Sequence, residues 1–235
     1  MSVIHRTTMT PGKLELLAAW LPAQPWYQGA TRGPELAKAG GFRLDDPQGE
    51  VGIEFMVVTD SSGDQPVSYH VPLSYRGAPL DGADQALIGT SEHGVLGRRW
   101  VYDGTQDPVV VAQLLALIQG RAEPQAQSAT NTPDPTVTRH FTGAALPDVV
   151  ASSTVVSGED GTDVVVEPSA ESEPHSASAG SAGSLTIKVT RVLLPDQQVP
   201  RTDAAGARGH VVAGWSSPDG DESRGPFVVL CDTVR

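Results

Sequence analysis

Two neighbouring segments of the chain alternate hydrophobic and polar residues with a period of two. The hydrophobic positions are Val51, Ile53, Phe55 and Val57 in the first segment and Val67, Tyr69, Val71 and Leu73 in the second. The turn-rich sequence DSSGDQP separates them, so the pattern predicts an antiparallel strand pair with one buried face. Because Pro72 lacks a ladder N–H, we expect the second strand to be an edge strand or to carry a bulge.

Apolar residues at helical spacing predict two helices on either side of these strands. The first should start at Thr10-Pro11 and end before Pro22, with an apolar stripe at Leu14, Leu17 and Leu21. The second should be capped by Asp107, start at Pro108 and end at Gly120, with Val111, Leu114, Leu115 and Ile118 on its core face.

Shorter patterns predict the remaining elements. We expect a turn of helix at 35–39 and strands at 42–44, 86–90, 95–102, 185–194, 209–217 and 225–234. Two apolar islands, at 147–158 and 162–167, also have the composition of strands.

Composition changes sharply at Glu123 and divides the chain into three parts. Residues 123–184 are rich in Ser, Thr, Pro, Ala and acids, and they hold nine acidic residues against one basic residue, Arg139. This composition favours a mostly flexible acidic linker. We therefore expect a domain at 1–122, the linker at 123–184 and a strand-rich segment at 185–235. Because three strands alone are marginally stable, we expect the last segment to pack beside the first sheet.

Bulk properties exclude several classes of protein. The formal charge of −12 argues against nucleic acid and anionic membranes as partners. The single cysteine, Cys231, can form no internal disulfide, and no apolar run is long enough to span a membrane. The first residues lack the apolar core of a signal peptide, so we expect a cytoplasmic protein.

Several phrases in the first 122 residues resemble the N-terminal cap of actinobacterial maltokinases. They are PWYQGATR, EVGIEFMVVTD, YHVPLSYRGAPL and VYDGTQDPVVVAQLLALI; the likeness rests mainly on Trp26, Tyr69, Val71, Pro72, Leu73, Asp103, Asp107 and Pro108. The resemblance implies an α+β fold, a curved antiparallel sheet with flanking helices that is similar in outline to cystatin. It also implies a link to maltose and α-glucan metabolism, including glycogen and trehalose.

A further likeness covers the later strands. SSTVVSGEDGT resembles the hairpin that begins a kinase small lobe, LTIKVTRVLLPD resembles the strand carrying the phosphate-contacting lysine, and VAGWSSPDGDESRGPFVVLCDTV resembles the last two strands of that lobe. The resemblance implies a remnant small lobe in which Lys188 would contact a nucleotide phosphate. The structural alternative is that Lys188 is the outward residue of a strand whose inward residues are Leu185, Ile187 and Val189.

Phosphoryl transfer also needs a positioning acid and metal-binding carboxylates. In the family these come from a large lobe with a His-x-Asp loop, and these residues contain neither that loop nor a GxxxxGK[ST] sequence. We therefore expect no kinase activity, no bound cofactor and no metal.

Aromatic and basic residues in loops and strand ends are candidates for a ligand or partner surface. They are Trp26, Tyr27, Arg32, Arg98 and Arg99, with Trp100 as a further ring that could stack on a sugar. For each of them the alternative is an ordinary structural role, in the core or in a surface ion pair.

Other reactive side chains have weaker patterns. His70 and His93, with Glu92 close to His93 in sequence, could form an acid/base or metal pair, but two histidines without a third ligand favour hydrogen-bonded structural roles. Ser91 and Ser153 lack a Gly-x-Ser-x-Gly context, and Cys231 is expected to be a small hydrophobic residue in a strand.

These observations lead to one main hypothesis and two alternatives. The main hypothesis is a non-catalytic binding or regulatory protein whose partner is an enzyme or kinase of carbohydrate metabolism. The first alternative is a kinase subunit that supplies cap and small lobe to a partner carrying the large lobe. The second is an unrelated hydrolase or ligand-binding cystatin-like domain, for which a deep apolar pocket at His70 or His93 would be evidence.

Overall fold

The computed structural model describes residues 8–30, 32–129, 131–143, 146, 150–168, 184–195, 197, 206–217 and 219–233. Before residue 108 it contains β1 (Met9–Thr10), α1 (Lys13–Trp20), η1 (Leu21–Ala23), β2 (Leu36–Leu44), β3 (Gly52–Asp60), β4 (Val67–Arg76), η2 (Asp84–Ala86), β5 (Leu87–His93), β6 (Gly97–Asp103) and η3 (Gly104–Gln106). After it come α2 (Pro108–Gln119), β7 (Gln125–Ala126), β8 (Thr138–Phe141), β9 (Val150–Gly158), β10 (Gly161–Pro168), β11 (Leu185–Val189), β12 (Val192–Leu193), β13 (Ala207–Ser216) and β14 (Glu222–Asp232).

The described strands form one antiparallel sheet of 14 strands. Its main path runs β1-β5-β6-β4-β3-β2-β13-β14-β11-β10-β9, and β12, β7 and β8 pair with β4, β2 and β13. The expected antiparallel sheet with helices is present; with two α-helices beside 14 strands, the described fold is mostly β.

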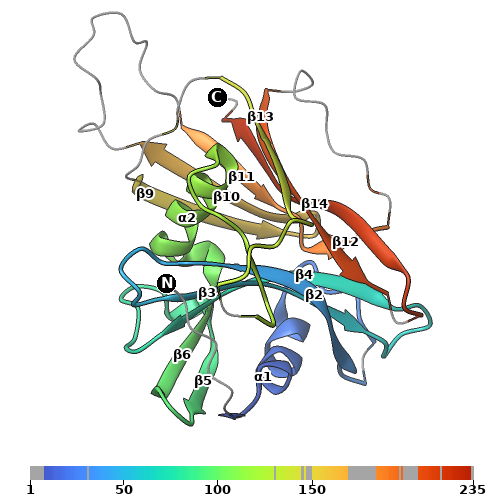
Figure 1. Cartoon of the computed structure of the whole chain (residues 1–235). Helices are drawn as coiled ribbons and strands as arrows, with labels where there is room; N and C mark the ends of the chain where they lie inside the picture. Colours follow the sequence, from blue (N-terminus) through green and yellow to red (C-terminus); the bar gives the residue numbers. More distant parts are fainter. Residues whose placement is uncertain are drawn as a thin grey trace, which may run out of the picture.

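The sheet bends into two halves that face each other, as Figure 1 shows. We call β1–β6 the cap sheet and β9, β10, β11, β14 and β13 the second sheet. They join along the path at a single pair, Gly40 with Trp215. Gly40 has φ +149°, and a Cβ there would lie 3.1 Å from the Trp215 Cα, so glycine permits this close approach.

Two hydrophobic cores hold the layers together. The larger lies between the cap sheet, α2 and the inner face of the second sheet, and it includes Phe42, Phe55, Leu114, Ile187 and Phe227. The smaller lies between the opposite face of the cap sheet and α1, and it includes Leu17, Trp26, Met56 and Tyr69. Strand β3 is therefore buried on both faces, whereas its alternation predicted one.

The strand that contains Pro72, β4, was expected to be an edge strand or to carry a bulge. This strand is not at an edge: it pairs with β3 along its whole length. Its other side changes partner at Pro72, because Tyr69 pairs with Val192 of β12 and Leu73 pairs with Asp103 of β6. The missing N–H of Pro72 thus falls where no ladder partner needs it.

The segment expected to form a turn of helix at 35–39 is instead part of β2. Pairing with β3 begins at Leu36 and continues past a bulge between Lys38 and Gly40. The first helix begins at Lys13, with Gly12 as its N-cap, rather than at Thr10-Pro11. The second helix begins and ends as predicted, at the Asp107 cap and Gly120.

Within the acidic segment, the two apolar islands do form strands. They are β9 and β10, a hairpin that extends the second sheet. Residues 169–183 lie outside the described residues, and the domain limits at 122 and 184 stay predictions. In the described parts of the chain, no helix is long and apolar enough to cross a membrane.

Candidate functional site

Lys188, the residue expected to contact a nucleotide, lies on the outer face of the second sheet. Its neighbours Ile187 and Val189 point the opposite way, into the core beneath α2. Its ammonium group donates a 2.9 Å hydrogen bond to Asp163, the residue opposite it on β10. Both side chains are about half exposed, at 55% and 43%, so this is a surface ion pair.

A cleft of about 450 Å³ surrounds this ion pair. The turn of the β9–β10 hairpin, the outer face of β11 and β14, and Gln197 line it. Its charged residues are three acids, Glu159, Asp160 and Asp163, and one base, Lys188, which gives a net charge of −2. Such a lining suits neutral or cationic ligands better than a polyphosphate.

The pairing of Lys188 also differs from that of a kinase lysine. In protein kinases the lysine on the third strand forms an ion pair with a helix glutamate. Here α2 covers the opposite face of the second sheet, and a strand residue, Asp163, takes the ammonium group. The third-strand position of Lys188, after the β9–β10 hairpin, does match that description.

Trp26, a candidate for a ligand or partner surface, is buried at 1% exposure and takes the alternative position, in the core. Its ring packs on Trp20 and Tyr69, with centroids 5.8 Å away in each case. The aromatic ring folds onto the cap sheet because η1 and the following turn carry it back over β4. Its neighbour Tyr27 is partly buried and donates a 2.8 Å hydrogen bond to Asp60.

Burial and the hydrogen bond to Asp60 raise the pKa of Tyr27 to about 12. Burial alone would raise the pKa of Asp60, but hydrogen bonds from the backbone of Glu35 and Ser62 and from Tyr27 outweigh it and lower the pKa. Because Tyr27 and the Glu35 N–H both donate to Asp60 of β3, these hydrogen bonds hold the loop before β2 against the sheet.

Arg32 lies apart from the adjacent Arg98 and Arg99, and each of the three has a local partner. Arg32 forms an exposed pair with Glu35 at 3.7 Å, Arg98 pairs with Glu92 at 2.9 Å, and Arg99 donates to the Leu96 carbonyl. Strands β4 and β3 separate β6, which carries Arg98 and Arg99, from β2. The structure therefore does not gather the predicted surface residues into one site; their role as a surface stays a prediction.

The two histidines are also apart. His70 is fully buried in β4, its Nδ1 lies 2.9 Å from the Thr190 carbonyl, and its ring lies 4.4 Å from Phe227. Burial, with a smaller effect of the nearby Arg191 charge, lowers the pKa of His70 to about 3. His93 accepts hydrogen bonds from the backbone of Val95 and Leu96 in a turn. Among the residues that the structure describes, no three His, Cys, Asp or Glu side chains converge as a metal site.

Sequence reasoning missed the polar group with the most central position, Arg191. This side chain is completely buried between the ends of β12 and β6 and forms an ion pair with Asp103. It also donates to Thr162 of β10 at 2.8 Å, and its guanidinium lies 5.1 Å from the centre of the Trp26 ring. Arg191 therefore connects the cap sheet, the second sheet and the α1 core; an arginine between apolar strand residues was the available signal.

A second missed cluster surrounds Glu54, which is buried on the α1 face of β3. Its carboxylate accepts hydrogen bonds from Lys13 and Tyr75 at 2.6 Å and from Gln127 at 3.1 Å. Burial alone would raise the pKa of Glu54, but the Lys13 charge and the Lys13 and Tyr75 hydrogen bonds outweigh it and lower the pKa. The Glu54 carboxylate therefore links α1, β4 and the segment after α2 through hydrogen bonds.

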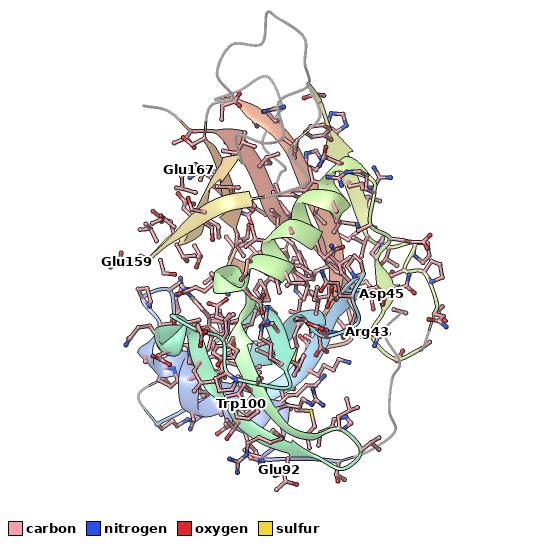
Figure 2. The ribbon with its side chains drawn as sticks, turned by 90° about the vertical axis from the view of Figure 1, so that its left-hand side faces the viewer. Arg43, Asp45, Glu92, Trp100, Glu159 and Glu167 are labelled. Atoms are coloured by element: carbon pink, nitrogen blue, oxygen red, sulfur yellow. The ribbon has the colours of Figure 1, made fainter. Side chains whose placement is uncertain are left out.

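Another open cleft, of about 510 Å³, lies between the β2–β3 turn and the segment after α2. Asp45, Asp46 and Glu123 line it together with Arg121 and the amides of Gln113, Gln125 and Asn131. Figure 2 shows Asp45 beside Arg43 at this junction. Asp46 accepts backbone hydrogen bonds from Gln48, Glu50 and Val51, so its carboxylate shapes the turn.

Comparison with known proteins identifies the cap portion. Residues 20–107 match the family model described as the maltokinase N-terminal cap domain. No curated protein matches the chain. The match runs from the last residue of α1 through β2–β6 to the Asp107 cap, and it agrees with the resemblance read from the same phrases. The chain therefore contains a maltokinase N-terminal cap domain at residues 20–107.

Proposed function

We propose that this chain is a non-catalytic binding or regulatory protein of maltose and α-glucan metabolism. The cap match at residues 20–107 supports the metabolic link. The sheet supports a single working unit, because β12 and β13 join the cap strands to the second sheet. A binding protein in this role would act in the cytoplasm beside a carbohydrate-metabolism enzyme.

The observation that carries the non-catalytic part of the proposal is the charge of the Lys188 cleft. Three carboxylates surround the single ammonium group, and the nearest of them already holds it at 2.9 Å. A nucleotide triphosphate would have to displace Asp163 and lie against Glu159 and Asp160, which costs like-charge repulsion.

The experiment is a phosphoryl-transfer assay with purified protein, MgATP and maltose, followed by detection of a phosphorylated sugar. We expect no product above the level of a blank without protein. Product that disappears in Lys188→Ala and persists in the exposed control Arg98→Ala would overturn the proposal.

A second candidate function is a kinase component that supplies cap and small lobe to a partner with the large lobe. The order of the later strands favours it: a hairpin, a lysine-bearing third strand and a final hairpin, β13–β14. Affinity purification of the tagged chain decides it. Recovery of a protein with a kinase large lobe, together with ATP turnover by the pair, would support this candidate; recovery without turnover would count against it.

A further inference from the structure

Strand β9 is the last strand on the path of the sheet, and none of the described strands pairs with its other side. On one side it pairs with β10 from Gly158 back to Val150, and the sheet path among the described strands ends with it. Figure 2 faces this end of the molecule, with Glu159 and Glu167 labelled near opposite ends of the hairpin. Along β9 the side chains of Ser152, Thr154 and Val156 are exposed, Val156 by 59%.

This edge carries neither the charge nor the proline that commonly prevents edge-to-edge pairing, and its bulge lies at its start, between Val150 and Ser152. Val150–Gly158, VASSTVVSG, contains no charged residue and no proline over nine residues. The other strands at the margins of the sheet are short or charged: β1, β7 and β12 have two residues each, and β8 has four and carries Arg139. A long, uncharged, exposed edge is a template for another strand.

We propose that β9 pairs antiparallel with β9 of a second copy, around a two-fold axis that passes by Thr154. In this register Thr154 faces itself and Val156 faces Ser152 of the other copy. Residues that face each other across an antiparallel pair share a side of the sheet, so the inner and outer faces of both copies stay continuous.

The charges near the edge favour a second copy as the occupant. Within the nine residues the two copies bring no like charges together. The next strand, β10, carries Asp163, which pairs with Lys188, and Glu167, which accepts a 3.1 Å hydrogen bond from Ser152. Glu159 and Asp160 fall outside the paired stretch, in the hairpin turn. The occupant needs an exposed, uncharged strand of the same length, and this chain presents one.

The register gives a crosslinking test in a Cys231→Ser background. Thr154→Cys places two sulfurs at the axis, where facing Cα atoms lie about 4.5–5.5 Å apart and a disulfide can form. The matched control Ser152→Cys leaves its two cysteines about 14 Å apart along the strands. We expect a covalent dimer under mild oxidation from Thr154→Cys and none from Ser152→Cys. Equal crosslinking of both variants, or of neither, would overturn the proposed register.

Sedimentation of the otherwise unchanged full chain tests the association itself. Because one strand pair buries a small interface, we expect a weak dimer that becomes visible toward ~100 μM. Added salt should increase the dimer fraction, since each copy carries a net charge of −12. A chain that stays monomeric across this range at high salt would contradict the proposal.

Charge variants at the axis separate self-pairing from any other occupant. Thr154→Lys or Thr154→Glu alone should weaken the dimer about tenfold or more, because like charges then face each other. A mixture of the two variants should recover the dimer, because opposite charges then face each other. Failure of the mixture to recover it would mean that the two β9 strands do not meet at Thr154.

Discussion

Arg191 is the residue whose environment departs most from the ordinary behaviour of its type. Its guanidinium is fully buried, pairs with Asp103 and donates to Thr162, while Trp26 packs against it. Three of the residues that carried the cap resemblance, Trp26, Leu73 and Asp103, belong to or adjoin this group. At the residue scale, the cap is therefore fastened to the second sheet by a cation from outside the matched range of 20–107.

Arg191→Met should destabilise the protein by about 3–5 kcal/mol, because it leaves the Asp103 carboxylate without its cation in a buried position. Asp103→Asn should do the same from the other side, and the double variant should lose less than the sum of the two. Urea unfolding measures all three. Arg98→Met, at the exposed pair with Glu92, is the control and should cost less than about 1 kcal/mol. Additive losses would show that the pair is not coupled.

His70 should make stability depend on pH. Its pKa is about 3 in the folded state against 6.5 for an ordinary histidine, because burial disfavours the charged ring. Below pH 6.5 the unfolded chain therefore binds the proton first, and folding stability falls as the pH drops toward about 3. The slope approaches about 1.4 kcal/mol per pH unit, so near pH 5 the loss should be roughly 2 kcal/mol.

Urea unfolding between about pH 7 and pH 5 measures this slope, and His70→Phe is the matched variant. The phenyl ring fits beside Phe55 and Phe227 but carries no titrating proton. We expect a flatter pH dependence in His70→Phe than in the unchanged chain. Identical slopes would mean that His70 does not carry the effect.

At the scale of elements, α2 shows which local signals decide structure. Asp107 caps the helix by accepting from the Val109 N–H at 3.0 Å and forms a two-bond ion pair with Arg76 at 2.6 Å. At the other end Gly120 adopts φ +81°, and the Arg139 guanidinium lies where a Cβ would be. Cap, Pro108 and terminal glycine act within a few residues, so the sequence alone predicted the helix and its limits.

Asp107→Asn and Asp107→Ala should separate the two roles of that carboxylate. Asn keeps an oxygen for the Val109 N–H but loses the charge that pairs with Arg76. Ala loses both, and it should therefore be less stable than Asn by about 1 kcal/mol, the usual contribution of an N-cap. Thermal or urea unfolding of the two variants measures the difference, and equal stability would show that the cap hydrogen bond contributes nothing.

Strand β2 shows where local signals fail. The composition at 35–39 and the Gly40-Gly41 pair favoured a broken helical turn, yet these residues form a ladder with β3 through a bulge. The reason is pairing on both sides: β3 follows β2 in a hairpin, and β13, which is far away in sequence, pairs with Gly40 on the other side. The predicted strand at 42–44 is therefore confirmed as the end of β2, whereas the first part of β2 was not predicted.

At the scale of the whole molecule, the layers could not be predicted from the pattern of any one segment. The alternation of β3 and β4 indicated one buried face, but α1 covers one side and the second sheet with α2 covers the other. Likewise, the acidic composition of 123–184 indicated flexibility, while β9 and β10 add a hairpin to the sheet there. The apolar islands were the only local sign of it, and their partner, β11, lies beyond residue 184.

The candidate site, too, was predictable from local sequence only in part. The sequence located Lys188 on a strand with its neighbours turned inward, and the structure has it there. The pairing with Asp163 and the acidic lining depend on how the β9–β10 hairpin folds over the outer face, which no local pattern encodes. Arg191 and Glu54 were missed because their partners come from distant elements.

A calorimetric titration of MgATP into the purified chain tests the central claim most directly, because the proposed function rests on the Lys188 cleft not holding a nucleotide. Lys188→Ala removes the ammonium group, whereas Asp163→Asn keeps it and removes the carboxylate charge that pairs with it. The two variants therefore lower and raise the positive charge that the cleft offers to a phosphate. We predict no binding heat for the unchanged chain or for Lys188→Ala. Binding by the unchanged chain that is lost in Lys188→Ala and strengthened in Asp163→Asn would contradict the account and favour a nucleotide-binding kinase component.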